Sequence, residues 1–314
     1  MYDKVKLWID RAMIGGNFSS IATYLESAKQ NTDLETGEVY TFGKLDRLNV
    51  SIYTGGVSIE GSLPKFLLGS NVYTLDRHLT AQAIEKISDN LHISVEKASV
   101  TKLEFGTNFL MKHPVVDYLS KLGAMPRLER LQVTANSIRY GGRGKQPPKV
   151  FSFYDKLADA DKKGMEYPED MRGQNLLRYE IRLFGRLPQQ LKVPEVKAST
   201  LTETPFYRAM HKRYKDSYFS IDKMNQIKTN VMSEIKTPTD ALNVFVARLI
   251  SQTGQDAIAG YLDELKEAEV FEDRKNYSRV KKRIQEIATK ANITASDELI
   301  KELDDEIRNC GAYV

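Results

Sequence analysis

Four stretches between residues 100 and 182 read as β-strands with an apolar face and a charged face. In the first stretch, K-L-E-F-G-T-N-F, Glu104 lies between two apolar neighbours, and in the last, L-L-R-Y-E-I-R-L-F, Glu180 and Arg182 flank Ile181. Alternation with a period of two is typical of strands that are buried on one side only. The pattern therefore predicts a sheet with one covered face and one face that presents charges to a ligand.

The order of the other predicted elements defines the fold class. Alternating strands and turn signals, among them the hairpin turn Gly55-Gly56, fill the first part of the chain, although 21–28 is predicted as a short helix. From Thr204-Pro205, where threonine caps a helix and proline occupies its first turn, the patterns are helical. We predict an α+β fold with an antiparallel or mixed sheet and flanking helices over 1–203, followed by an α-helical C-terminal domain over 204–314.

Composition narrows the function classes. The net charge is +4, the only cysteine is Cys310, and no apolar run approaches the roughly 18 residues of a membrane span. We expect a cytoplasmic protein with no membrane partner. The chain has no G-x-x-x-x-G-K-[ST], G-x-G-x-x-G or H-E-x-x-H motif, which argues against an ATPase, a Rossmann enzyme and a histidine-metal site.

Glu104 and Glu180 are the candidate metal ligands. Their positions within strands would direct both carboxylates to the charged face, and carboxylate oxygens suit Mg²⁺ or Mn²⁺. The alternative is that these glutamates form ion pairs across the sheet with Arg178, Arg182 or Lys102.

Two tyrosines are candidate nucleophiles. Tyr140 ends a strand and precedes the turn Gly141-Gly142-Arg143-Gly144-Lys145, where a phosphate could approach the backbone closely, so it is preferred. Tyr154, in V-F-S-F-Y-D-K, is the competitor. It shares a strand face with Lys156, a further catalytic candidate, and either side chain could point at the site. The structural alternative for each tyrosine is simple packing on the sheet.

Basic residues gather at two places that suit a nucleic-acid backbone. The first group lies in and beside the glycine-rich turn, the second on the first C-terminal helix, and two arginines lie on the last strand. The candidate DNA-binding residues are Arg139, Arg143, Lys145, Lys149, Arg178, Arg182, Arg208, Lys212 and Arg213. For the helical group, a solvated helix face is the alternative.

Several of these motifs together resemble the phage and plasmid replication proteins of the II/X type, which are rolling-circle replication initiators. The resemblance runs from G-S-L-P-K-F-L-L-G-S-N at Gly61, through K-L-E-F-G-T-N-F, F-Y-D-K and L-L-R-Y-E-I-R-L, to K-A-S-T-L near Thr200. A more distant likeness to plasmid initiators with the motif Y-F-G-S-R-K places Tyr140 at the nucleophile. It also places Glu104 and Glu180 at the metal, although such initiators usually carry aspartate where Glu104 stands.

This resemblance implies a function. The protein would bind single- and double-stranded origin DNA and nick one strand with Mg²⁺ or Mn²⁺, leaving a 5′-phosphotyrosine and a 3′-hydroxyl primer. Host helicase and polymerase would be partners, and a homodimer is left open. The alternatives are a non-catalytic origin-binding protein and a mobilisation relaxase.

Overall fold

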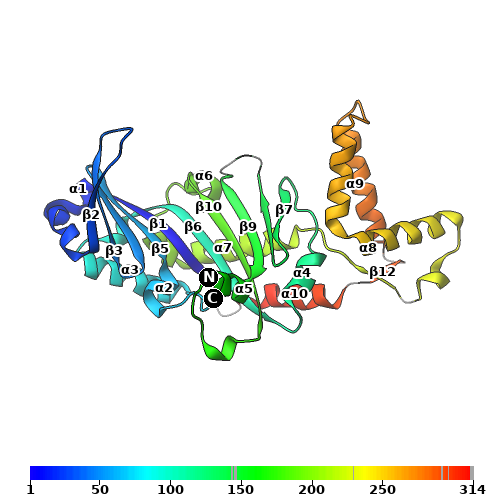
Figure 1. The fold of residues 1–314 in the computed structure, drawn as a ribbon, viewed down its shortest axis with the longest axis horizontal. Helices are drawn as coiled ribbons and strands as arrows, with labels where there is room; N and C mark the ends of the chain where they lie inside the picture. The colour runs from blue at the N-terminus through cyan, green and yellow to red at the C-terminus, as the bar shows by residue number, and fades with distance from the viewer. Residues whose placement is uncertain (143, 145–146, 229, 291–292, 296, 312–314) are drawn as a thin grey trace.

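A ten-stranded antiparallel sheet runs through the protein in the order β2-β3-β4-β5-β1-β6-β10-β9-β8-β7 (Figure 1). The computed structural model describes residues 1–142, 144, 147–228, 230–290, 293–295 and 297–311. The sheet strands are β1 (Tyr2–Asp10), β2 (Glu26–Thr32), β3 (Val39–Leu45), β4 (Leu48–Tyr53), β5 (Gly56–Ser62), β6 (Ser99–Met111), β7 (Glu129–Thr134), β8 (Ser137–Gly141), β9 (Lys149–Asp155) and β10 (Asn175–Phe184).

Helices flank this sheet and make up most of the C-terminal part. They are α1 (Arg11–Ile14), α2 (Leu63–Leu68), α3 (Arg77–Leu91), α4 (Val115–Lys121), α5 (Lys156–Lys162), α6 (Leu187–Leu191), α7 (Thr204–Phe219), α8 (Pro238–Glu267), α9 (Lys275–Ala288) and α10 (Glu298–Asn309). A small pairing of β11 (Gln226–Ile227) with β12 (Thr294–Ala295) joins the segments before α8 and after α9. The α+β class and the C-terminal helices are therefore as predicted.

One face of the sheet is covered and forms the core. Over β6, β9 and β10 the cover is α7, whose Tyr214 ring lies 4.2 Å from that of Tyr179 and 5.8 Å from that of Phe105. Over β1 and β5 it is α2, supported by α3, and the apolar residues of both helices belong to the same buried cluster. This is the apolar face predicted from the alternation.

The opposite face of β1 and its neighbours is open to solvent, and we call it the open face. In β1, Val5, Leu7 and Ile9 are buried, whereas Lys4 is exposed and Trp8 is half-buried. The strand at the far edge, β2, is exposed along its whole length. The stretch predicted as a helix over 21–28 divides between a 3-10 helix (Gly15–Tyr24) and the start of β2, so that prediction was wrong for its second half.

The C-terminal helices divide between two hydrophobic clusters. Phe206, Met210 and Tyr214 of α7 and Leu303 of α10 are buried in the core of the sheet. By contrast, a separate cluster under α8 contains Val231, Val244, Ala247 and Ile293. The domain boundary between residues 203 and 204 stays a prediction. No helix in the described ranges is both long and apolar enough to cross a bilayer.

His211 of α7 is buried between aromatic rings. Its ring centroid lies 4.6 Å from that of Tyr207 and 5.2 Å from that of Phe105, and neither ring nitrogen has a hydrogen-bond partner among the described residues. Burial, together with the N-terminal ammonium and Lys215, lowers the pKa of His211 from 6.5 to about 4. The folded protein therefore favours the neutral imidazole.

Because the pKa of His211 is lowered on folding, we expect the folded protein to lose stability in mild acid. Between pH 6.5 and pH 4 the unfolded chain binds a proton at His211 that the folded chain does not, so stability falls as the pH drops through this window. The expected loss is about 1–3 kcal/mol. Urea denaturation from pH 7 to pH 4 should show a shallower pH dependence for His211→Phe than for wild type. Equal slopes would contradict the assignment.

Candidate active site

Three carboxylates from adjacent strands meet on the charged face of the sheet. They are Asp3 of β1, Glu104 of β6 and Glu180 of β10, and each offers an oxygen within 4.8 Å of the others. Gly106 makes room for this cluster, because a Cβ at that position would lie 2.6 Å from the Cβ of Glu180. Glu104 and Glu180 were predicted from the sequence, whereas Asp3 was not.

Arg178 lies fully buried beneath the carboxylates. Its guanidinium donates to Asp3 Oδ2 at 2.5 Å, to Glu180 Oε2 at 2.7 Å and to Asn108 Oδ1 at 3.1 Å. A charge with no solvent exposure is tolerated only when its donors are satisfied, and here two carboxylates and an amide accept from it. Arg178 is thus part of the carboxylate cluster and is not accessible as a DNA contact.

Arg182 lies on the solvent side of the same cluster. Its Nε is 3.3 Å from Glu104 Oε1, its Nη2 contacts Glu180, and its side chain is 28% exposed. The cross-strand ion pairs considered as the alternative to a metal site are therefore present. Lys102 does not take part in these ion pairs, because its ammonium group pairs with Glu60 at 3.3 Å.

The protonation properties of the cluster fit a cation site. Burial raises the pKa of Asp3, but Arg178 and hydrogen bonds outweigh this effect and hold it below its usual value. Burial, and then Glu180, raises the pKa of Glu104 to about 7, although Arg182 opposes the shift. Three carboxylates thus share two arginines, and a bound cation would favour the ionised form of Glu104. An all-oxygen donor set of this kind suits Mg²⁺ or Mn²⁺.

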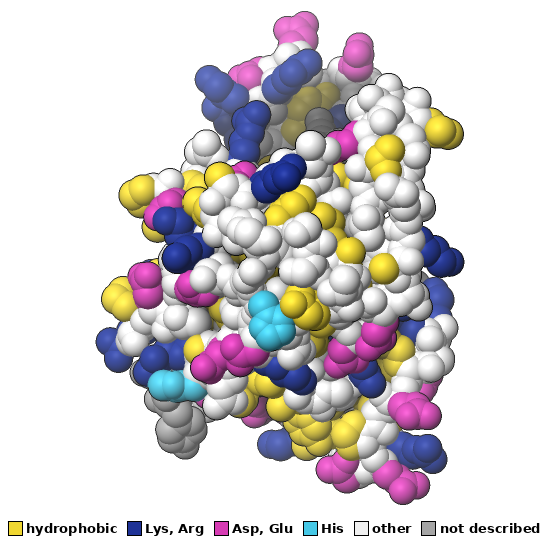
Figure 2. All heavy atoms as spheres, turned by 90° about the vertical axis from the view of Figure 1, so that its left-hand side faces the viewer, with side chains coloured by type: hydrophobic (Ala, Val, Ile, Leu, Met, Phe, Trp, Pro, Cys, Tyr) yellow, Lys and Arg dark blue, Asp and Glu magenta, His cyan; other side chains and the backbone are white. Residues whose placement is uncertain are grey.

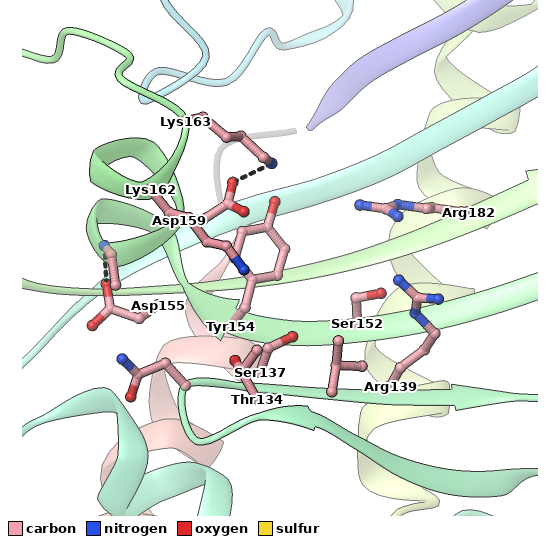
Figure 3. A pocket seen from close by; sticks show the side chains of 13 residues that line it. Thr134, Ser137, Arg139, Ser152, Tyr154, Asp155, Asp159, Lys162, Lys163 and Arg182 are labelled. Atoms are coloured by element: carbon pink, nitrogen blue, oxygen red, sulfur yellow. Dashed lines mark hydrogen bonds and ion pairs between the residues drawn. The ribbon is translucent and has the colours of Figure 1, made fainter.

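Tyr154 lies beside the carboxylates, at a pocket of about 420 Å³. Its hydroxyl donates to Glu180 Oε2 at 3.2 Å, and burial raises its pKa above the usual value. Figure 3 shows the phenol ring between α5 and the arginines of β8 and β10. The other lining residues include Ser137, Arg139, Ser152, Asp159, Lys162, Lys163 and Arg182. A half-buried tyrosine is therefore placed in a basic pocket, and its hydroxyl contacts a candidate metal ligand.

Tyr140 lies on the other face of the sheet. It is fully buried, its hydroxyl donates to the carbonyl oxygen of Gly123 at 2.8 Å, and its ring packs edge-on against Phe153 at 6.1 Å. The register instead puts Arg139 on the face of the carboxylates, since Arg139 and Glu180 are both paired with the same residue of β9. The structure therefore does not bring Tyr140, the preferred candidate, to the candidate ligands, whereas it brings Tyr154 to Glu180.

Lys156 begins α5 and is 2% exposed. Its ammonium donates to Asn71 Oδ1 at 2.9 Å, and burial, with a further contribution from Arg178, lowers its pKa to about 8. It lines a second pocket, next to the loop after α2, and not the pocket of Tyr154.

The predicted DNA-binding residues divide between the two faces. Arg139 and Arg182 line the pocket of Tyr154. Lys149, Lys212 and Arg213 line a groove against α7, on the opposite face, and Arg208 is exposed on the same helix. Arg143 and Lys145 lie outside the described residues. The basic residues within the described ranges therefore do not form one continuous surface with the carboxylates.

Comparisons with known proteins bear on the resemblance found in the sequence. The structure is similar to that of the rolling circle replication initiator protein from Geobacillus stearothermophilus, with 12% sequence identity and a TM-score of 0.41, covering 73% of this chain and 88% of the other. No curated protein sequence matches the chain. The Phage_CRI family model, described as the N-terminal part of a replication-associated protein, matches residues 1–205, which is more than half of the chain. The chain therefore belongs to the Phage_CRI family of replication-associated proteins.

Proposed function

We propose that this protein is a rolling-circle replication initiator that nicks one DNA strand with Tyr154. The observation that carries the proposal is the hydrogen bond from the Tyr154 hydroxyl to Glu180, at 3.2 Å, beside two further carboxylates. A tyrosine nucleophile needs a proton acceptor, because its phenol is neutral near pH 7, with an ordinary pKa of about 10 that burial raises further here. Glu180 Oε2 is positioned to accept that proton.

Asp3, Glu104 and Glu180 would hold a Mg²⁺ or Mn²⁺ ion. When bound, the ion would neutralise charge on the scissile phosphate. Arg182 lies over the same carboxylates and lines the pocket, so it would turn toward the phosphate when a cation replaces it. Because its side chain is partly exposed, this movement does not require unfolding.

The reaction would exchange one phosphorus–oxygen bond for another. The Tyr154 oxygen would bond to phosphorus as its proton passes to Glu180, and the bond to the 3′ oxygen would break. The products are a 5′-phosphotyrosine and a 3′-hydroxyl after protonation of the leaving oxygen. Arg139 and Arg182, which line the pocket, would hold the phosphate oxygens through charge-assisted hydrogen bonds.

Origin DNA is the proposed partner of this site. A host helicase and polymerase would act on the strand that nicking releases, and a homodimer would supply a second tyrosine for rejoining. The domain over 1–203 would carry the nicking site, and the helices over 204–314 would form the second domain.

One observation favours a second candidate function, a non-catalytic origin-binding protein. Arg178 and Arg182 already pair with the three carboxylates, so ion pairs alone account for their clustering. Metal-dependent conversion of supercoiled origin plasmid to the open circle separates the two candidates, since only the nicking enzyme would catalyse it.

Glu104→Gln tests the metal site with little risk to folding, because Glu104 is only partly buried and its ion-pair partner is the partly exposed Arg182. The substitution removes an anionic ligand and keeps the side-chain shape. We expect at least tenfold weaker Mn²⁺ binding by calorimetry, and nicking that is lost at limiting Mn²⁺ but partly restored by excess. The exposed Glu195 supplies the matched control, Glu195→Gln. Equal Mn²⁺ affinity for Glu104→Gln and wild type would remove Glu104 from the ligand set.

A further inference from the structure

The open face carries a cluster of aromatic side chains away from the carboxylates. The rings of Tyr40 on β3 and Tyr53 on β4 are stacked, with centroids 5.1 Å apart and planes at 25°, and the Trp8 ring of β1 lies 6.0 Å from Tyr53. All three side chains are half-buried, so each keeps some solvent-accessible surface. We call these three residues the aromatic platform.

Three lysines lie between the platform and the carboxylates. The ammonium groups of Lys4, Lys6 and Lys102 are 3.8, 3.6 and 3.3 Å from the carboxylate of Glu60, respectively. Three positive charges against one negative charge leave an excess of two. The lysine side chains are 35–49% exposed, so this excess is presented to solvent.

The register between β1 and β6 places the carboxylates, the lysines and the aromatic platform along one continuous line on the sheet. On β6, Lys102 is two residues from Glu104, and it is paired directly with Lys6 of β1. On β1, Lys6 is two residues from Trp8, so both side chains point to the open face. The path from Glu104 to Lys102, across to Lys6 and on to Trp8 has two steps of about 7 Å along the strands and one of about 5 Å between them. Its length is therefore on the order of 20 Å. That length accommodates a few nucleotides of extended single strand.

We propose that the open face binds the single-stranded DNA that flanks the scissile phosphate, with its phosphates on the lysines and its bases on the aromatic platform. This inference rests on the proposed function and identifies where its substrate would lie. Single-stranded nucleic acid is recognised by a basic track combined with aromatic rings on which unpaired bases stack. The phosphates of a duplex could also contact the lysines. Its bases, however, are stacked on one another, so their faces could not contact the aromatic rings.

The surroundings of the platform are consistent with sequence-tolerant binding. Figure 2 shows the end of the molecule where β2 and β3 lie, with lysine and arginine side chains dispersed among acidic, hydrophobic and polar ones. In β2, Lys29 is paired with Phe42 and Asn31 with Tyr40, so polar side chains border the platform at the edge of the sheet. At such an edge the bound DNA could pass from the sheet surface into solvent.

The single tryptophan of the chain makes the proposal directly measurable. Full-length protein in EDTA is titrated with a roughly 12-nucleotide oligo(dT) while tryptophan fluorescence is followed, so that no cleavage takes place. We expect saturable quenching. Tyr53→Ala should raise the Kd about 5- to 150-fold, the range for one lost stacking contact, and Tyr53→Phe should restore wild-type affinity. Lys6→Ala combined with Lys102→Ala should reduce the salt-dependence slope by about 1.4.

The matched control is Tyr261→Ala, which removes an exposed tyrosine from α8 and should leave the Kd unchanged. Absence of quenching, wild-type affinity of Tyr53→Ala with its fold intact by circular dichroism, or tighter binding of a duplex than of oligo(dT) would each overturn the proposal. Binding is measured without metal and without nicking. Failure of the nicking reaction would therefore leave this result intact, and failure here would leave nicking by Tyr154 untouched.

Discussion

Tyr154→Phe is expected to eliminate the covalent adduct between the protein and a single-stranded origin oligonucleotide while preserving binding. Only the hydroxyl that donates to Glu180 is removed, and the ring keeps its place between α5 and β10. Loss of a nucleophile commonly costs a factor on the order of 10⁴ or more in rate. A denaturing gel of protein incubated with labelled oligonucleotide and Mn²⁺ measures the adduct directly.

Tyr140→Phe is the matched comparison for this experiment. It removes a hydroxyl that donates to the backbone of Gly123 on the covered face, so we expect the adduct to persist. The cost should be about 1 kcal/mol of stability, as for a typical lost hydrogen bond. An adduct that survives Tyr154→Phe and vanishes in Tyr140→Phe would reverse the assignment. Wild-type protein that forms no adduct with any divalent metal would favour the non-catalytic function.

Arg178→Met is expected to destabilise the protein by about 3–5 kcal/mol. Methionine fills much of the same volume, but it leaves the buried Asp3 without its ion-pair partner and Glu180 with Arg182 alone. A buried carboxylate without a partner is among the most costly defects in a fold. Urea denaturation at pH 7 in EDTA measures the loss.

Two comparisons make this prediction specific to the carboxylate cluster. Arg182→Met should cost much less, because Arg182 is 28% exposed and water can solvate the groups that it leaves. Mn²⁺ should recover part of the loss in Arg178→Met, since an ion bound by the same carboxylates replaces the missing charge. If Mn²⁺ stabilised neither wild type nor Arg178→Met, the cluster would be an ion-pair network and not a metal site.

Much of the site follows from alternation along single strands. Glu104 and Glu180 share a face because each is flanked by apolar residues that must enter the core. Alternation also separates the two tyrosines, although the glycine-rich turn after Tyr140 favours that residue as the nucleophile. Tyr140 is two residues from the buried Ile138 and therefore points into the core, while Tyr154 is two residues from Ser152 on the polar face.

Other features were out of reach of a local pattern. The strand β2 has no apolar alternation, because it is an edge strand exposed on both faces, and its pairing with β3 alone defines it. The aromatic platform joins β1, β3 and β4, and no spacing in the sequence shows that these rings are neighbours.

The sequence by itself determined the α+β class, the charged face, two of the three carboxylates and the family. Only the tertiary structure decided the third carboxylate. Simple alternation would place Asp3 on the same side as the buried Val5 and Leu7, inside the core. A register irregularity between Tyr2 and Val5, where β1 pairs with β6, breaks the alternation: Tyr2 enters the core, and Asp3 joins Arg178 on the charged face. A bulge of this kind depends on the partner strand, so a single strand's sequence does not specify it.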